Sequence, residues 1–221
     1  MTIIQSFPDQ PMILCKYRDW SNIYHRTIIT KRELYFAPPS SFEDVTDCRN
    51  DCVEFSEDER KINFQEFDKR CGILSMTKNQ NNSKLWEEYA DNYRGFLVAF
   101  DGQMLCSLFS SCGDVTYYNE LPPIKYSREQ SIEEYIYHKY FAKSMQYMHE
   151  QEFRLVNVNF NGFSNEQRKV KVPIEAYKYI QIGKNMPQSF RKALINCIPV
   201  ELKTIPIFFN KYYDLQERIN V

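Results

Sequence analysis

The stretch His149-Glu150-Gln151-Glu152-Phe153-Arg154-Leu155-Val156-Asn157-Val158-Asn159-Phe160 holds the strongest strand signal in the chain. From Phe153 onward, apolar residues alternate with arginine and asparagine, and this period of two is typical of a half-buried β-strand. The charged residues Glu150, Glu152 and Arg154 are spaced two apart at its entrance. In an extended backbone they share one face. The stretch therefore predicts a strand that begins with two carboxylates and a guanidinium on the same side.

Shorter apolar runs predict further strands, and amphipathic spacing predicts the helices between them. The strands are expected at 12–17, 33–37, 72–77, 95–100, 170–173, 179–182 and 204–209, and the helices at about 20–29, 57–70, 83–93, 131–148 and 187–197. Strands and helices do not alternate regularly in this order, which favours an α+β fold with a mixed or mostly antiparallel sheet core and flanking helices. No stretch resembles a linker, so residues 1–221 are predicted to form a single domain.

The charge balance disfavours two broad classes of partner. The 221 residues include 28 lysines and arginines and 29 aspartates and glutamates, which gives a net charge of −1. A chain this close to neutrality has no general attraction to nucleic acids or to membrane surfaces. It contains no apolar run of about 18 residues, and residues 1–12 lack the basic start and apolar middle of a signal peptide. Seven cysteines, scattered and odd in number, are typical of a reducing compartment. We expect a cytoplasmic protein without a membrane segment.

Arg18 ends the first predicted strand, in the sequence Lys16-Tyr17-Arg18. A guanidinium at this point can present its planar fork to a phosphate or a carboxylate, while Tyr17 stacks on a ring or donates a hydrogen bond. An arginine at a strand end equally serves as a surface or structural ion-pair residue. Both interpretations stay open.

Ser75 and Thr77 stand two apart on the strand expected at 72–77, so their hydroxyl groups point to one face. Together with Trp86 and Tyr89 from the next helix, they could line a polar cleft beside aromatic rings. The alternative is a strand packed on an amphipathic helix.

The carboxylate pair Glu150 and Glu152 is the third candidate. A carboxylate held by Arg154 stays ionised, and its neighbour can then act as a base or as a hydrogen-bond acceptor. The alternative is a surface strand with a cross-paired glutamate and arginine.

A metal site is not predicted. Cys48 and Cys52 lie near Asp47 and Asp51, but a Cys-x3-Cys spacing without a second pair or a nearby histidine is not that of a zinc finger. The sequence also lacks a glycine-rich phosphate loop, a Gly-x-Ser-x-Gly elbow and a His-Glu-x-x-His helix.

Taken together, these motifs resemble a widespread bacterial family that is known only as a domain of unknown function. The matching pieces, in order, are Lys16-Tyr17-Arg18, Leu34-Tyr35-Phe36, Pro39 to Phe42 with Asp47-Cys48, Ile73 to Thr77, Trp86 to Asp91 with Gly95, and Glu150 to Arg154. The family-like core covers residues of about 12–160, and further strands and a helix are expected at about 168–221. Two departures stand out: Glu43-Asp44-Val45-Thr46 replaces the family's Asn-Asp-Pro-Phe, and Leu85 replaces its methionine.

The order of the motifs is similar to that of ADP-ribosyltransferases, in which an early arginine or histidine, a middle Ser-x-Ser or Ser-x-Thr and a late Glu-x-Glu bind and cleave NAD. The resemblance implies that NAD is the substrate and that no metal is needed. By this analogy Arg18 holds an NAD phosphate or ribose, Glu152 stabilises the transition state and Glu150 orients the acceptor. The cofactor-binding set would be Tyr17, Arg18, Ser75, Thr77, Trp86 and Tyr89, with Tyr89 stacked on nicotinamide.

The leading hypothesis is an NAD-using transferase or glycohydrolase that acts as a bacterial toxin or anti-phage effector, with a protein or nucleic acid as acceptor. One alternative is a non-enzymatic module that binds a nucleotide, a peptide or a partner protein. Another is a nuclease whose acidic loop, with Asp44, Asp47 and Asp51, holds Mg²⁺ and whose basic patch includes Arg168. The sequence specifies neither the acceptor nor the oligomeric state.

Overall fold

A computed structural model describes residues 12–42, 44, 47–48, 68–121, 139–212 and 215–219. The chain packs as two compact units. Unit 1 comprises Met1–Leu34, Met76–Leu108 and Val170–Val221, and unit 2 comprises Tyr35–Ser75 and Phe109–Lys169. The prediction that these residues form a single domain stays a prediction.

The sheet of unit 1 is built around β4 (Phe96–Asp101), a strand whose first five residues are apolar. Its strands are β1 (Ile13–Arg18), β4, β10 (Tyr177–Ile182), β11 (Ile207–Tyr212) and β12 (Leu215–Ile219), in the spatial order β12-β11-β10-β4-β1. All neighbours pair antiparallel except β10 and β11, which are parallel. The central strand β4 is buried from Phe96 to Phe100, because β1 and β10 flank it and helices cover both of its faces.

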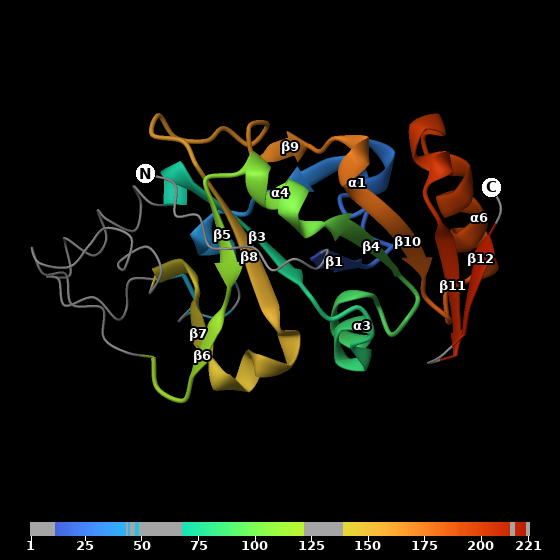
Figure 1. Ribbon diagram of the computed structural model, residues 1–221, viewed down its shortest axis with the longest axis horizontal. Coiled ribbons are helices and arrows are strands. Elements are labelled where there is room, and N and C mark those ends of the chain that lie inside the picture. The colour runs from blue at the N-terminus through green and yellow to red at the C-terminus, as the bar shows by residue number, and fades with distance from the viewer. Residues whose placement is uncertain are drawn as a thin grey trace, which may run out of the picture. The chain divides into compact units, whose positions relative to one another are not determined.

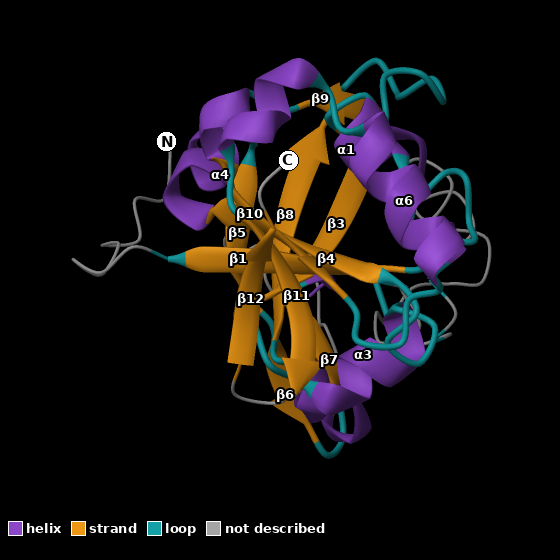
Figure 2. Ribbon diagram, turned by 90° about the vertical axis from the view of Figure 1, so that its right-hand side faces the viewer, coloured by secondary structure: helices purple, strands orange, loops and turns teal. Residues whose placement is uncertain are grey.

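Helices cover both faces of the sheet in unit 1. The helix α3 (Ser83–Tyr89) lies on one side of β1 and β4, whereas α1 (Thr27–Thr30) and α4 (Gly102–Leu108) lie on the other side (Figures 1 and 2). The longer α6 (Gln188–Cys197) contacts β11 through Arg191, whose guanidinium lies 3.9 Å from the ring centroid of Phe209. Two short 3-10 helices, η4 (Ile174–Ala176) and η5 (Val200–Thr204), complete this unit.

Side chains next to the helices fix where two of them begin. The carboxamide oxygen of Asn82 accepts the backbone N–H groups of Lys84 and Leu85 and so caps α3. The carboxylate of Asp101 accepts the N–H of Met104 in the first turn of α4. Asp101-Gly102 therefore starts a helix, although the pair reads as a turn in the sequence.

Unit 2 contains β3 (Cys71–Thr77, whose last two residues belong to unit 1), β8 (Glu152–Val158) and β5 (Ser111–Asp114), which lie side by side in the order β3-β8-β5. β5 pairs antiparallel with β8. A small sheet of unit 2 consists of β6 (Thr116–Tyr118) paired in parallel with β7 (Ala142–Ser144). A second small sheet, of β2 (Glu33–Tyr35) and β9 (Lys169–Lys171), consists mostly of residues of unit 1. The 3-10 helices are η1 (Pro39–Ser41) and η3 (Met145–Glu150).

The α+β class and the mostly antiparallel sheet are confirmed. The helix predicted at 131–148 is wrong from residue 142 onward, because 142–144 form a strand and 145–150 form a 3-10 helix. The helix predicted at 57–70 lies almost entirely outside the described residues. The helix predicted at 20–29 shrinks to Thr27–Thr30 because the preceding residues form turns.

Two further predictions concern the cell compartment. Among the described residues, no helix is long and apolar enough to cross a membrane. Cys15, Cys48, Cys71 and Cys197 are free thiols, whereas Cys106 and Cys112 are disulfide-bonded. The disulfide state differs from the fully reduced set of cysteines that their scattered positions predict.

Candidate functional site

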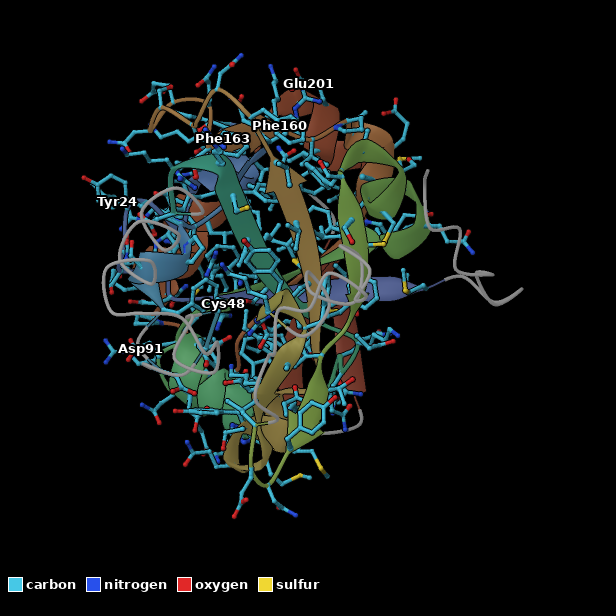
Figure 3. All side chains as sticks on the ribbon, turned by 90° about the vertical axis from the view of Figure 1, so that its left-hand side faces the viewer. Tyr24, Cys48, Asp91, Phe160, Phe163 and Glu201 are labelled. Carbon is cyan, nitrogen blue, oxygen red and sulfur yellow. The ribbon has the colours of Figure 1, made fainter. Side chains whose placement is uncertain are left out.

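Five charged residues of unit 2 that are buried in the interior contact one another, and we call them the charged cluster. They come from four separate segments: Glu152 and Arg154 from β8, Lys143 from β7, Glu150 from the end of η3, and Asp47 from the loop after η1. Cys48, next to Asp47, is buried as well and lies in the interior in Figure 3.

Arg154 is the centre of the charged cluster and is fully buried. Its Nε lies 2.6 Å from Oε1 of Glu152, and its Nη2 lies 2.7 Å from Oδ2 of Asp47 and 3.1 Å from Oε2 of Glu152. Its Nη1 donates to the carbonyl oxygen of Tyr140 at 2.7 Å and to Sγ of Cys48 at 2.9 Å. Each nitrogen of the guanidinium therefore has a partner, as a buried arginine requires.

Lys143 joins the carboxylates on the other side. Its Nζ lies 2.6 Å from Oε2 of Glu150, 3.1 Å from Oε2 of Glu152 and 3.7 Å from Oδ2 of Asp47. The same ammonium lies 4.6 Å from the ring centroid of Tyr147, within the range of a cation–π contact.

The backbone does not bring the two glutamates together in the predicted way. Gln151 adopts a left-handed conformation with φ 44°, and Glu150 ends a 3-10 helix, so the extended geometry begins only at Glu152. Both carboxylates nevertheless reach Lys143. The two carboxylates therefore meet at Lys143, which the sequence analysis does not include, and the predicted shared face of an extended strand holds only for Glu152 and Arg154.

The electrostatics of the charged cluster keep Glu152 ionised. Burial by itself raises the pKa of a carboxyl group, but the charges of Arg154 and Lys143 and hydrogen bonds from Arg154 and Ser75 outweigh it, so the pKa of Glu152 lies well below its usual range. Burial lowers the pKa of Lys143, yet the three carboxylates around it raise that pKa above its usual value. Three carboxylates against two cations leave the charged cluster with a formal charge of −1.

Burial decreases from the centre of the charged cluster to its edge. The side chains of Arg154, Asp47 and Glu152 are 0–2% exposed, whereas those of Lys143 and Glu150 are each 9% exposed. Tyr117, whose hydroxyl oxygen accepts the N–H of Glu152 at 2.7 Å, is half-buried like Tyr147. Among the described members of the charged cluster, Glu150 and Lys143 are therefore the two that lie nearest to solvent.

The carboxylates of the charged cluster and the neighbouring thiol of Cys48 are engaged by Arg154 and Lys143. Among the described residues, no group of three or more His, Cys, Asp or Glu side chains could hold a metal ion. Asp47 bonds to Arg154, and Asp51 and Cys52 lie outside the described residues. Burial raises the pKa of the Cys48 thiol well above its usual value, which keeps it protonated.

Arg168, a member of the predicted basic patch, is buried as well. Its guanidinium donates to the carbonyl oxygens of Phe36, Cys71 and Asp68. It therefore ties together backbone segments of unit 2 and is not part of a basic surface.

The other predicted site residues lie in unit 1. Tyr17 and Trp86 are buried, with ring centroids 5.1 Å apart in an edge-to-face contact, and the Tyr17 hydroxyl donates to the carbonyl of Asn79. The buried Thr77 hydroxyl accepts the N–H of Asn79, and Tyr89 is 45% exposed. The surroundings of Trp86 agree with the alternative of a strand packed on an amphipathic helix, whereas Tyr89 is open to solvent. That these residues form one site with Ser75, Glu150 and Glu152 stays a prediction.

Arg18 is half-buried at the end of β1, and within the described part of the chain it forms no ion pair with a carboxylate at 4 Å or less. Burial lowers its pKa to about 10. The same environment acts on His25, whose pKa is lowered to about 4 by burial and by the positive charge of Arg18, against a smaller opposing effect of Asp19. Arg18 is therefore a partly desolvated guanidinium whose positive charge acts on the neighbouring His25.

The lowered pKa of His25 predicts that acid destabilises this part of the protein. Because the unfolded chain binds the proton near pH 6.5 and the folded chain only near pH 4, folding stability falls as the pH decreases through that window. In urea unfolding, the midpoint of the wild type should decrease more than that of His25→Gln as the pH falls from 6.5 to 4, because glutamine takes up no proton. His149→Gln is the control. Equal pH dependence of the wild type and His25→Gln would contradict the assignment.

The sequence analysis does not predict Lys143 and Asp47 as members of the charged cluster. Lys143 lies within the helix that the spacing predicts at 131–148, and Asp47 lies in the loop to which the nuclease alternative assigns Mg²⁺. No pattern within either segment marks these two residues as partners of Glu152 and Arg154.

The chain matches no family model, no curated protein and no solved structure. The resemblance to the bacterial family and to ADP-ribosyltransferases stays a prediction from the motifs. Of those motifs, Asp47-Cys48, the Ser75 strand and Glu150 to Arg154 meet at the charged cluster, although they are far apart in the sequence.

Proposed function

We propose that this protein breaks the glycosidic bond between nicotinamide and ribose in NAD, as an ADP-ribosyltransferase or an NAD glycohydrolase. The observation that carries the proposal is the preorganised charged cluster, which has an uncompensated negative charge and reaches solvent at Glu150. Glycosidic bonds break through transition states in which positive charge develops on the sugar. Fixed negative charge in a site of low dielectric stabilises such a state more than the ground state.

In the proposed reaction the electron pair of the bond leaves with nicotinamide, which departs as a neutral molecule. The positive charge then lies on the ribose, where the carboxylates of Glu150 and Glu152 oppose it. Water or a nucleophile of the acceptor adds to the same carbon and loses its proton to solvent. Glu150, at the edge of the charged cluster, is the carboxylate that reaches the sugar, and Glu152 is the ionised group that holds Lys143 in place.

The sequence analysis assigns Arg18, in unit 1, to the diphosphate of NAD, and this assignment stays a prediction. A guanidinium binds a phosphate through two parallel hydrogen bonds, and Arg18 forms no ion pair with a carboxylate of the described residues.

A second candidate function is a binding module without turnover. The burial of Glu152 and its contacts with Arg154 and Lys143 favour it, because a carboxylate engaged on both oxygens can serve the fold alone. In that case the charged cluster is structural.

The test is to incubate the purified protein with NAD and to follow the release of free nicotinamide. The proposal expects release that increases linearly with protein concentration. Saturable binding of NAD without release would support the binding module instead. If the protein neither releases nicotinamide nor binds NAD, the proposal that it uses NAD is overturned.

A further inference from the structure

Tyr117 of β6 lies at the edge of the charged cluster and has no part in the reaction described so far. Its hydroxyl oxygen accepts the backbone N–H of Glu152 at 2.7 Å. The carbonyl oxygen of Glu152, on the other hand, accepts the N–H of Val115, which follows β5. In a regular antiparallel pair, both groups of Glu152 would bond to the backbone of the same residue. A side-chain hydroxyl therefore takes the place of a backbone carbonyl where β8 begins.

The same tyrosine belongs to the strand pair that carries Lys143. In the parallel register of β6 and β7, Tyr117 lies opposite Lys143. Residues that lie opposite each other in neighbouring strands point to one face of the sheet. The ammonium group of Lys143 lies 2.6 Å from Glu150 and 3.1 Å from Glu152. Tyr117 therefore lies beside the lysine that joins the two carboxylates.

The hydroxyl group of Tyr117 keeps its hydrogen at neutral pH. Burial raises its pKa to about 12. The negative charges of Glu152 and Glu150 act in the same direction, against the Glu152 N–H and the charge of Lys143. A protonated hydroxyl that accepts a hydrogen bond still has one hydrogen to donate. Tyr117 is therefore an uncharged donor next to the carboxylates.

This hydrogen has no acceptor among the residues that the structure describes. Within them, the side chain of Tyr117 makes one hydrogen bond, in which it accepts the N–H of Glu152. The hydroxyl groups of the buried Tyr140 and Tyr177, in contrast, each donate to an acceptor. Because Tyr117 is half-buried and not sealed in the interior, its hydrogen is available to solvent or to a ligand.

We propose that Tyr117 contacts the substrate: its hydroxyl group donates a hydrogen bond to a hydroxyl oxygen of the ribose that lies beside Glu150. This inference rests on the proposed cleavage of NAD and adds to it a residue that no sequence motif marks. The N–H of Glu152 holds the tyrosine oxygen in place, so the donor is oriented before the sugar binds. An uncharged donor positions the sugar without cancelling the negative charge that the reaction uses, as a lysine or an arginine would.

Tyr117→Phe removes the hydroxyl group and keeps the ring, and Tyr118→Phe is the matched control. Tyr118 is the next residue of β6 and is half-buried as well, but neighbouring residues of a strand point to opposite faces. Nicotinamide release is measured with NAD and with two analogues, in which hydrogen replaces the 2′- or the 3′-hydroxyl group of the nicotinamide ribose. Circular dichroism establishes that each variant is folded. The quantity compared is the ratio of kcat/KM for NAD to kcat/KM for each analogue.

For one of the two analogues, this ratio should be about tenfold smaller in Tyr117→Phe than in the wild type. The reason is that the variant has already lost the hydrogen bond that the analogue cannot make. Tyr118→Phe should keep the ratios of the wild type. If Tyr117 serves the fold alone, Tyr117→Phe loses the same factor with NAD and with both analogues. Unchanged ratios in the folded variant would therefore overturn this inference and leave the cleavage of NAD standing.

A wild type that binds NAD without releasing nicotinamide is tested in the same way, with dissociation constants in place of kcat/KM. A smaller ratio in Tyr117→Phe again supports the contact, and equal ratios overturn it. If the wild type neither binds nor cleaves NAD, the proposed function fails and the contact fails with it.

Discussion

An Arg154→Met protein is expected to lose about 3–5 kcal/mol of folding free energy, which corresponds to a decrease of about 6–20 °C in Tm for a chain of this size. Methionine matches the length of the arginine stem, so the loss comes mainly from charge. Without the guanidinium, Asp47 and Glu152 each lose an ion pair but stay buried as carboxylates. Lys143 is then the one described cation in contact with them. A buried charge that has lost its partner is far more costly than an exposed one.

Arg94→Met is the matched control for this measurement. Arg94 pairs with Asp91 at 3.5 Å, but its side chain is 51% exposed. An exposed pair contributes about 0–1 kcal/mol, so the variant should unfold close to the wild type. Thermal unfolding by circular dichroism at pH 7 compares the two. A change of 1 kcal/mol corresponds to about 2–4 °C in Tm for a chain of this size. If the Tm of Arg154→Met lies within that range of the Tm of Arg94→Met, water or a conformational change compensates the lost ion pairs of the carboxylates.

The apolar strands of the sheet could be predicted because each follows from local pattern. Phe96 to Phe100 is apolar throughout, and it forms the buried centre of unit 1 as a flanked strand should. The failures have nonlocal causes. Residues 131–148 show helical spacing, but from Ala142 onward pairing with β6 overrides it, because the parallel contact with Thr116–Tyr118 supplies backbone hydrogen bonds that the spacing does not reveal.

The candidate site shows the same division. The spacing of Glu152 and Arg154 in one strand is local, and their contact could be predicted, whereas Glu150 lies before the strand and joins through Lys143. Asp47 and Lys143 join through contacts that span 107 and 9 residues of sequence, and no pattern within either segment marks them. The burial of the charged cluster could not be predicted either, because charged residues at the start of a strand are usually exposed.

Glu150→Gln is expected to reduce nicotinamide release by a factor of about 10²–10³ and to change stability little. The variant removes the carboxylate at the edge of the charged cluster and its excess negative charge, and groups that stabilise developing charge have effects of this size. Lys143 keeps Glu152 and Asp47 as partners, so the loss of folding free energy should stay near 1 kcal/mol. Release of nicotinamide from NAD and thermal unfolding are measured on the same preparations.

Glu166→Gln is the matched control, because Glu166 pairs with a lysine at the same distance as Glu150 does but is exposed. Lys169 and Glu166 also lie 2.6 Å apart in unit 2, but the Glu166 side chain is 81% exposed. This variant should keep both its activity and its Tm. The comparison separates the loss of a lysine–glutamate pair from the loss of a carboxylate in the charged cluster.

Glu152→Gln separates catalysis from structure. It neutralises the same excess charge as Glu150→Gln, but it also removes a carboxylate oxygen from Arg154 and from Lys143 in the sealed interior, so both turnover and stability should fall. If Glu150→Gln keeps full turnover while Glu152→Gln unfolds at lower temperature, the charged cluster serves the fold and the negative charge is not used in chemistry. If Glu150→Gln loses turnover at an unchanged Tm, the edge of the charged cluster is where the sugar binds, because no loss of folding then remains to explain the loss of activity.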